Sequence, residues 1–185
     1  MSTAPRSYPW TSQFGAQSVN FRLMNTGDTE LFKSFIRSLP PEDNFYLLVD
    51  VHKDSAIDTW MKGIESGATL SVIALESDQI VGYCNLHMND VPWIRHVGEI
   101  RMSVAPAFRG RGLGQTLANE VFTIARARGL QKIWARMAAS QKAAQSVFEG
   151  LGFHAEALLA DFVKDSNGRT QDLVIMSHDV TGFVQ

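Results

Sequence analysis

The segment from Val104 to Gln115 has the residue types of an anion-binding loop. Gly110, Gly112 and Gly114 alternate along it, and glycine lets the backbone pass close to a bulky group with its N–H groups turned inward. A strand-like stretch precedes the segment and an amphipathic helical pattern follows it, so the positive end of a helix dipole would act on the same site. The segment therefore predicts a site for a phosphate-bearing ligand.

The glycine spacing excludes two common nucleotide-binding loops. A dinucleotide-binding fingerprint needs glycine at the sixth position counted from Gly110, where this chain has Gln115, and an acidic residue about twenty positions on, whereas residues 132–137 carry none. A nucleoside-triphosphate loop needs Lys-Ser/Thr after its last glycine, whereas Gly114 precedes glutamine. What remains is the pattern Arg-x-x-Gly-x-Gly, beginning at Arg109.

This pattern is similar to the pyrophosphate loop of the GNAT family of N-acetyltransferases. A second run, from Ser140 to Phe153, resembles the family's Asn-x-x-Ala-x-x-x-Tyr-x-x-x-Gly-Phe; Gln141 takes the place of the asparagine and Phe148 that of the tyrosine. The resemblance covers roughly residues 19–180. Its specific part begins near Gly98 and ends at Phe153.

The resemblance implies a single-domain α+β fold, with a mixed, mostly antiparallel sheet of about seven strands, about four flanking helices and a splayed pair of central strands. Hydrophobic periodicity and turn signals agree with this class. We expect the acetyltransferase domain over residues 19–185. Residues 1–18, rich in Ser, Pro, Ala and Gln, are expected to form a loosely ordered arm that Tyr8, Trp10 and Phe14 could dock onto the domain.

Individual elements follow from local patterns. Strands are expected over residues 19–24, 69–75, 79–88, 96–104, 130–138, 155–164 and 169–178. Helices are expected after the cap residues 26–28, from Ser55 towards Gly67, and over residues 113–128. The short apolar run within residues 42–53 fits either state.

The resemblance also implies the cofactor, acetyl-CoA, whose acetyl group would pass directly to a primary amine. Backbone N–H groups from Arg109 to Gln115 would hold its diphosphate, and the two loop arginines could add charge. The splayed strand would pair with the pantetheine arm. The cofactor-binding residues are then Met102, Ser103, Val104, Arg109, Gly110, Arg111, Gly112, Leu113, Gly114, Gln115, Gln141 and Phe148.

Two catalytic residues are expected from the same resemblance. The N–H of Met102 would lie near the thioester oxygen, and Glu99 would accept the proton of the amine. The alternative for Glu99 is a structural pair with a neighbour such as Arg101. His87 and His96 are weaker candidates for the base.

The residue at the family's tyrosine position is the main departure. Phenylalanine at 148 cannot protonate the departing thiolate, although a thiol with a pKa of about 8.5 leaves tolerably as the anion. Water or Ser140 could supply the proton instead, or Phe148 could simply pack. Gln141 can still offer an amide to pantetheine.

The acceptor is not named by the sequence. Phe45, Tyr46, Trp60 and Trp93 lie in the segments that usually shape the acceptor pocket, but each is more typical of a core residue. We expect a small-molecule amine as acceptor, with a protein N-terminus or a lysine less favoured. The competing hypothesis is a non-catalytic acyl-CoA-binding module. A homodimer is compatible with either.

A length of 185 residues is enough for one well-buried domain and short for two. A formal net charge of -2 directs the chain neither to nucleic acid nor to a membrane, and no run approaches the ~20 apolar residues of a membrane span. No metal site is expected. The single cysteine, Cys84, indicates a packed thiol and a reducing compartment, so we expect the cytoplasm.

Overall fold

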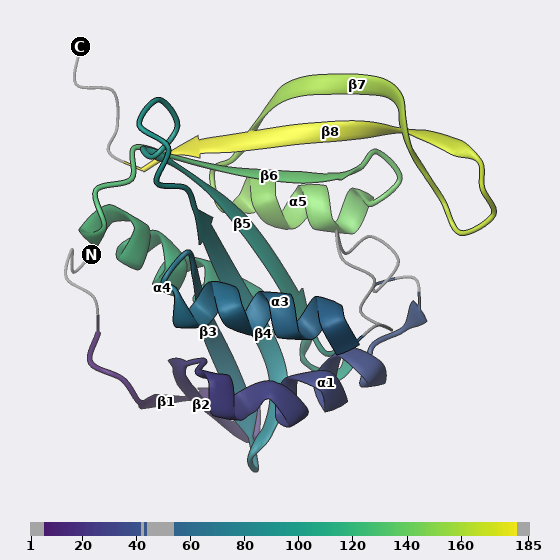
Figure 1. The fold of residues 1–185 in the computed structure, drawn as a ribbon. Helices are drawn as coiled ribbons and strands as arrows, with labels where there is room; N and C mark the ends of the chain where they lie inside the picture. Colours follow the sequence, from purple (N-terminus) through teal and green to yellow (C-terminus); the bar gives the residue numbers. More distant parts are fainter. Residues whose placement is uncertain (1–5, 42, 44–53, 181–185) are drawn as a thin grey trace.

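A single mixed sheet organises the protein (Figure 1). The computed structural model describes residues 6–41, 43 and 54–180. The strands are β1 (Trp10–Phe14), β2 (Gln17–Leu23), β3 (Thr69–Glu76), β4 (Gln79–Met88), β5 (Val97–Val104), β6 (Lys132–Ala138), β7 (His154–Lys164) and β8 (Thr170–Asp179). They lie in the order β1-β2-β3-β4-β5-β6-β8-β7, and every neighbouring pair is antiparallel except β5 and β6. The predicted α+β class with a mostly antiparallel sheet is confirmed, with eight strands in place of about seven.

The additional strand, β1, comes from the predicted arm. It pairs with β2, where the ring of Trp10 stacks on Phe21 with centroids 4.2 Å apart. Phe14 is buried in the core, and the Tyr8 hydroxyl donates a 2.8 Å hydrogen bond to Glu120. Residues 10–14 are therefore a strand of the sheet rather than a loose arm, because their aromatic side chains find apolar partners on it.

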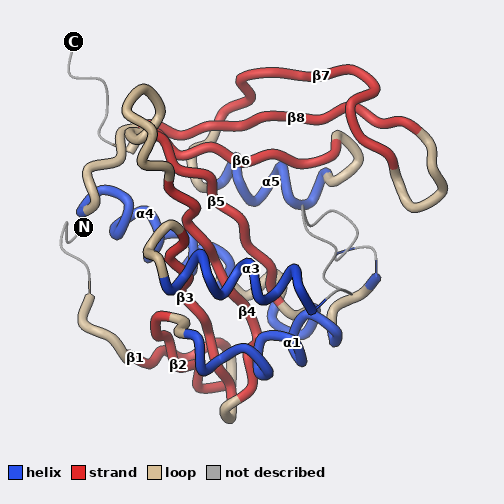
Figure 2. The backbone as a smooth tube through the Cα atoms, viewed as in Figure 1, coloured by secondary structure: helices blue, strands red, loops and turns tan. Residues whose placement is uncertain are grey.

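Helices cover both faces of the sheet (Figure 2). The described α-helices are α1 (Thr29–Ser38), α3 (Asp54–Glu65), α4 (Leu113–Ala127) and α5 (Lys142–Gly150). One face packs on α1 and α3 through a core that includes Phe32, Trp60 and Tyr83. The opposite face packs on α4, whose Leu117 and Val121 are fully buried. The helix α4 thus buries the apolar side of the amphipathic pattern that follows the loop.

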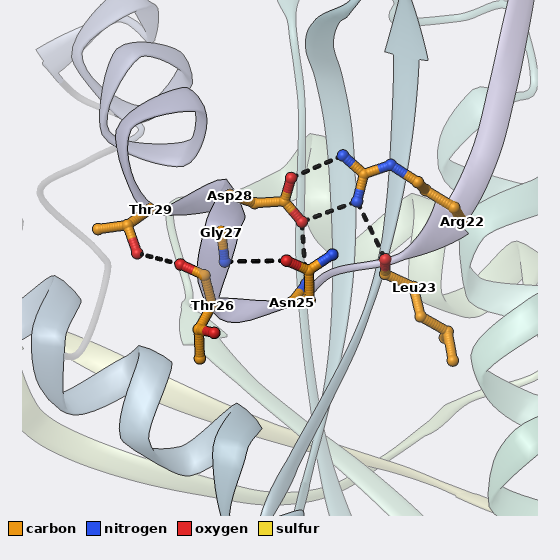
Figure 3. A network of polar contacts seen from close by, with 7 residues as sticks. All are labelled: Arg22, Leu23, Asn25, Thr26, Gly27, Asp28 and Thr29. Atoms are coloured by element: carbon orange, nitrogen blue, oxygen red, sulfur yellow. Dashed lines mark hydrogen bonds and ion pairs between the residues drawn. The ribbon is translucent and has the colours of Figure 1, made fainter.

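A polar network fixes the passage from β2 into α1 (Figure 3). Arg22 binds the carboxylate of Asp28 through both terminal nitrogens, at 2.7 and 2.6 Å, and the same carboxylate accepts the N–H of Asn25 at 2.9 Å. The Asn25 side chain in turn accepts the N–H of Gly27, completing a reciprocal cap on the short 3-10 turn before α1. Arg22 lowers the pKa of Asp28, since its guanidinium favours the charged carboxylate.

The feature that positions the site is the separation of β5 from β6. These parallel strands pair only from Val97, opposite Lys132, to Glu99, opposite Trp134. Beyond that point β5 continues to Val104 and β6 to Ala138 without a shared ladder. The predicted splayed pair is confirmed, and the loop to α4 follows directly at the end of β5.

Candidate active site

The glycine-rich loop joins β5 to α4 through a 3-10 turn, Pro106–Phe108. Gly110 has φ +69° and Gly112 has φ +85°, so both occupy the left-handed region that disfavours residues with a Cβ. Gly112 is the N-cap of α4. A Cβ added at either glycine would meet no atom within 4 Å, so the surface of the loop is open.

The loop presents a row of free backbone donors. Among the described residues, no N–H from Gly110 to Gln115 donates to a backbone carbonyl; the first inward bond of α4 is from Thr116 N to Gly112 O, at 3.0 Å. The first turn of any helix leaves such donors, and a helix of 15 residues adds its dipole to them. The row is therefore complementary to an anion.

The two loop arginines are both held by the protein. Arg109 donates from Nε to the Val104 carbonyl at 2.9 Å and forms an ion pair with Asp43. Arg111 donates to the Gln17 side chain at 2.6 Å. Both guanidinium groups thus hold the loop to neighbouring segments. A contact of either arginine with a bound phosphate stays a prediction.

The ladder between β4 and β5 decides which way the β5 backbone faces. Ala105 N–H donates to Val81 O at 2.8 Å, and hydrogen-bonded residues alternate along an antiparallel pair. Ser103 therefore bonds to β4, whereas the N–H groups of Met102 and Val104 face away from β4, into the splay. The Met102 and Val104 side chains lie beside the loop: a Cβ at Gly114 would be 3.9 Å from Met102 and 3.6 Å from Val104.

Glu99 lies where the β5–β6 ladder ends, on the face covered by α1 and α3. Its Oε1 accepts Arg101 Nε at 2.9 Å and Arg136 Nε at 3.1 Å. Both hydrogen bonds go to Oε1, and neither arginine donates to Oε2. The Glu99 side chain is only 12% exposed, and both arginines beside it are more exposed. The cluster holds one negative and two positive charges. The pairing of Glu99 with Arg101 that the sequence suggested is present.

The two histidines differ in environment. His87 lies directly opposite Glu99 on β4, and its Nδ1 is 2.9 Å from Thr69 Oγ1. Burial lowers the pKa of His87 to about 4, and nearby Arg101 acts in the same direction. His96 has an exposed side chain outside the splay, before β5 begins. His87 is thus close to the splay but neutral at physiological pH.

The second motif region is largely structural. Gln141 accepts the N–H of Ala138 at 2.9 Å, so its amide oxygen closes the turn between β6 and α5. Phe148 is buried, with its ring perpendicular to that of Phe153 and centroids 4.9 Å apart. Ser140 is exposed in the same turn. Leu113 of the loop is also a core residue, so only its backbone faces a ligand.

The exposure of the cysteine and of the aromatic candidates shows which of them are core residues. Cys84 is a fully buried core thiol whose pKa is raised by burial, as the sequence predicts. Trp60 is a core residue, whereas Trp93 is 78% exposed, so the expectation that Trp93 belongs to the core is wrong. It lies in the connection between β4 and β5. Phe45 and Tyr46 lie outside the described residues.

Sequence reasoning missed two residues of this region. Arg136 belongs to neither motif, and only the pairing of β5 with β6 brings it to Glu99. Asp43, the partner of Arg109, is 66 positions away along the chain. No local signal in the sequence reports either contact.

Comparison with known proteins decides the family. The model of the Acetyltransferase (GNAT) family matches residues 30–153. The chain belongs to the GNAT acetyltransferase family. A ribosomal protein bS18-alanine N-acetyltransferase from Haemophilus ducreyi is 21% identical over 142 residues, which cover 74% of this chain and 94% of that relative. The sequence match and the geometry above agree that the chain is an acyltransferase.

Solved structures share the GNAT fold with this chain. A ribosomal-protein-S5-alanine acetyltransferase from Vibrio fischeri superposes with a TM-score of 0.77 at 14% identity, covering 97% of this chain and all of that one. The acetyltransferase yncA from Salmonella typhimurium, solved with acetyl-CoA, superposes with a TM-score of 0.73 at 19% identity, covering 90% of this chain and 96% of that one. No helix in the described part of this GNAT chain is long and apolar enough to cross a membrane.

Proposed function

We propose that this GNAT enzyme transfers the acetyl group of acetyl-CoA to the α-amine at the N-terminus of a protein or peptide, with alanine as the first residue. The named relatives act on the alanine of a ribosomal protein, which supplies the acceptor class. The observation that carries the proposal is the Glu99 cluster, in which one carboxylate is shared by two arginines.

The residues present fit coenzyme A. Free N–H groups from Gly110 to Gln115 match a diphosphate, and the open space above Gly112 leaves room for it. The N–H groups of Met102 and Val104 face the splay, where an extended pantetheine arm would pair with them. When bound, the cofactor would supply an activated acetyl thioester.

Different residues of this chain would serve the separate steps of acetyl transfer. With acetyl-CoA bound, the N–H of Met102 would donate to the acetyl oxygen, a contribution of about 3 kcal/mol for one such donor. Glu99 Oε2, which neither arginine uses, accepts the proton of the acceptor amine. Phe148 takes no part in proton transfer, because it carries no hydroxyl and is packed on Phe153. The thiolate of coenzyme A would therefore leave as the anion and then take a proton from water.

The charge of the cluster favours an α-amine over a lysine or polyamine. An α-amine with a pKa of 7.7–8.0 is neutral in roughly one molecule in ten at pH 7, whereas a lysine-like amine with a pKa of about 10.4 is neutral in roughly one in 2,500. The difference corresponds to about 3 kcal/mol. A site with Arg101 and Arg136 around a single carboxylate repels ammonium groups, so it is better matched to the amine that needs less help to lose its proton.

The test is a panel of three acceptors. We expect thiol release from acetyl-CoA, and acetylated product by mass spectrometry, with an alanine-initiated peptide that lacks lysine. The same peptide with a blocked α-amine and one internal lysine, and spermidine, should react at least about 10²-fold more slowly at pH 7, as the neutral fractions require. Turnover of spermidine with no reaction of the free peptide would replace this proposal by the small-molecule one.

A further inference from the structure

In the part of the chain that the structure describes, a group of buried polar atoms without hydrogen-bond partners lies beneath α3. Within the described chain, seven buried side-chain atoms lack a hydrogen bond, and all except Trp10 Nε1 belong to this region. They are Trp60 Nε1, Ser71 Oγ, Tyr83 OH, Asn85 Nδ2 and Oδ1, and His87 Nε2. We call these five residues the polar row. Four of them lie on β3 and β4: Ser71 pairs with Asn85, and Tyr83, Asn85 and His87 are alternate residues on one face of β4.

Such a concentration is unusual, because among the residues that the structure describes Trp10 Nε1 is the single unpartnered buried side-chain atom outside the row. Asp28 is bound by Arg22, Glu120 by Tyr8 and Ser177 by Glu156. A buried group without a partner destabilises the folded state and calls for a functional explanation. Asn85 is the extreme case, since it is 0% exposed and both of its amide atoms are unpartnered.

The position of Asn85 relates it to the acceptor side of the splay. It lies opposite Ser71 on β3 and opposite Arg101 on β5, so the three side chains share the face covered by α1 and α3. Arg101 borders the splay, where the acceptor amine must meet the acetyl group. Asn85 is thus one strand spacing, about 4.8 Å, from the strand that holds the reacting groups.

The hydrogen-bond donor and acceptor of the Asn85 carboxamide indicate which ligand group would be complementary. In either orientation of the amide, Asn85 offers one donor and one acceptor side by side, and the backbone N–H and C=O of one extended residue, which point the same way, offer the reciprocal pair. The first peptide unit of an acceptor lies about one residue, roughly 3.5 Å, from its α-amine. Neither a polyamine nor a lysine side chain carries an amide there.

We propose that Asn85 binds the second residue of the acceptor through its backbone N–H, which belongs to the first peptide unit, and its backbone C=O, and so selects peptide N-termini over other amines. The inference rests on the proposed function. Trp60 lies over the row, with its ring centroid 5.5 Å from that of Tyr83 and 6.1 Å from that of His87. The acceptor reaches Asn85 by displacing this indole, which exposes Trp60 Nε1 as a further donor.

The test compares two acceptors that differ by one atom. One is the alanine-initiated peptide; the other is its depsipeptide analogue, in which the first peptide N–H is replaced by an ester oxygen. We expect wild-type kcat/KM to fall about tenfold or more for the ester, because a buried acceptor is then left unpaired. In Asn85→Leu the amide-to-ester ratio, which is kcat/KM for the amide peptide divided by kcat/KM for the ester, should lie within about twofold of one. The KM for the amide peptide should rise, and the Kd for CoA should be unchanged.

Two further variants make the comparison specific. Cys84→Val alters the neighbouring, equally buried residue of β4 on the opposite face, and should keep the wild-type ratio. Asn85→Ala repeats the test if the leucine variant fails to fold. Asn85→Leu should also raise Tm by about 2–4 °C, because an apolar side chain replaces unpaired polar atoms.

The outcomes separate the inference from the function on which it rests. Equal amide-to-ester ratios in the wild type and in Asn85→Leu, with the peptide still acetylated, would overturn the role of Asn85 alone. A wild-type ratio of one would do the same. A wild type that acetylates spermidine and not the peptide would overturn both proposals.

Discussion

Gly112→Ala provides the sharpest test of the loop, because the same helix offers a matched control. Gly112 precedes α4 with φ +85°, and Gly129 follows it with φ +77°; a Cβ would meet nothing within 4 Å at either position. Alanine at each site costs about 1–2 kcal/mol of backbone strain. For a chain of this size, Tm should fall by about 2–8 °C in both variants, to a similar extent.

Only Gly112→Ala should weaken binding of CoA. The added methyl group projects into the open surface that we assign to the diphosphate, so we expect a loss of affinity of about tenfold or more. At a CoA concentration of 100 times the wild-type Kd, ligand binding stabilises the wild type and Gly129→Ala by about 2.7 kcal/mol. In Gly112→Ala the same concentration is about 10 times Kd and gives about 1.4 kcal/mol.

Thermal unfolding with and without CoA measures this difference directly. The CoA-induced rise in Tm should be about half as large in Gly112→Ala as in Gly129→Ala, and titration calorimetry should report the corresponding Kd values. Equal CoA-induced shifts in the two glycine variants would refute the assignment of the diphosphate to the loop.

Three other predictions concern the catalytic side of the splay. Glu99→Gln should lower kcat for an alanine-initiated peptide by about 10²-fold at pH 7, with the defect shrinking by pH 9 as the α-amine loses its proton unaided; an unchanged rate at pH 7 would remove Glu99 as the base. Because the pKa of His87 falls from about 6.5 when unfolded to about 4 when folded, the unfolded state binds more protons between these values, so stability rises with pH across this window by up to about 3 kcal/mol. Denaturant titrations should show that His87→Gln flattens this rise in stability with pH. An equally steep rise in the variant would show that His87 is not its cause. Phe148→Tyr should lower Tm by a few degrees and leave kcat within about twofold, since its hydroxyl would be buried against apolar side chains; a tenfold gain in kcat would show instead that a missing acid limits turnover.

The loop was predictable from sequence because its chemistry is local. Glycines at 110 and 112 are required by backbone conformation, and the helix that follows is encoded by its own apolar stripe. The hairpin of β3 and β4 and the helix α3 are local in the same sense. Their predicted positions agree with the structure to within a few residues.

The contacts that sequence reasoning missed are non-local. The alternation in β1 is weak, and only the pairing of Trp10 with Phe21 makes that segment a strand. Arg136 reaches Glu99 only because two parallel strands pair for three residues and then separate. The unpartnered amide of Asn85 is likewise a property of the packed face, since any buried strand position could carry a satisfied asparagine.

Hydrogen exchange of the backbone amides tests the central claim most directly. The N–H groups from Gly110 to Gln115 have no backbone acceptor within the described chain, so they should exchange rapidly in the free protein and slow markedly when CoA binds. Protection should extend to Met102 and Val104, whose N–H groups face the splay. If CoA binds and the amides of residues 110–115 exchange as fast as before, the diphosphate lies elsewhere and the account of this site is wrong.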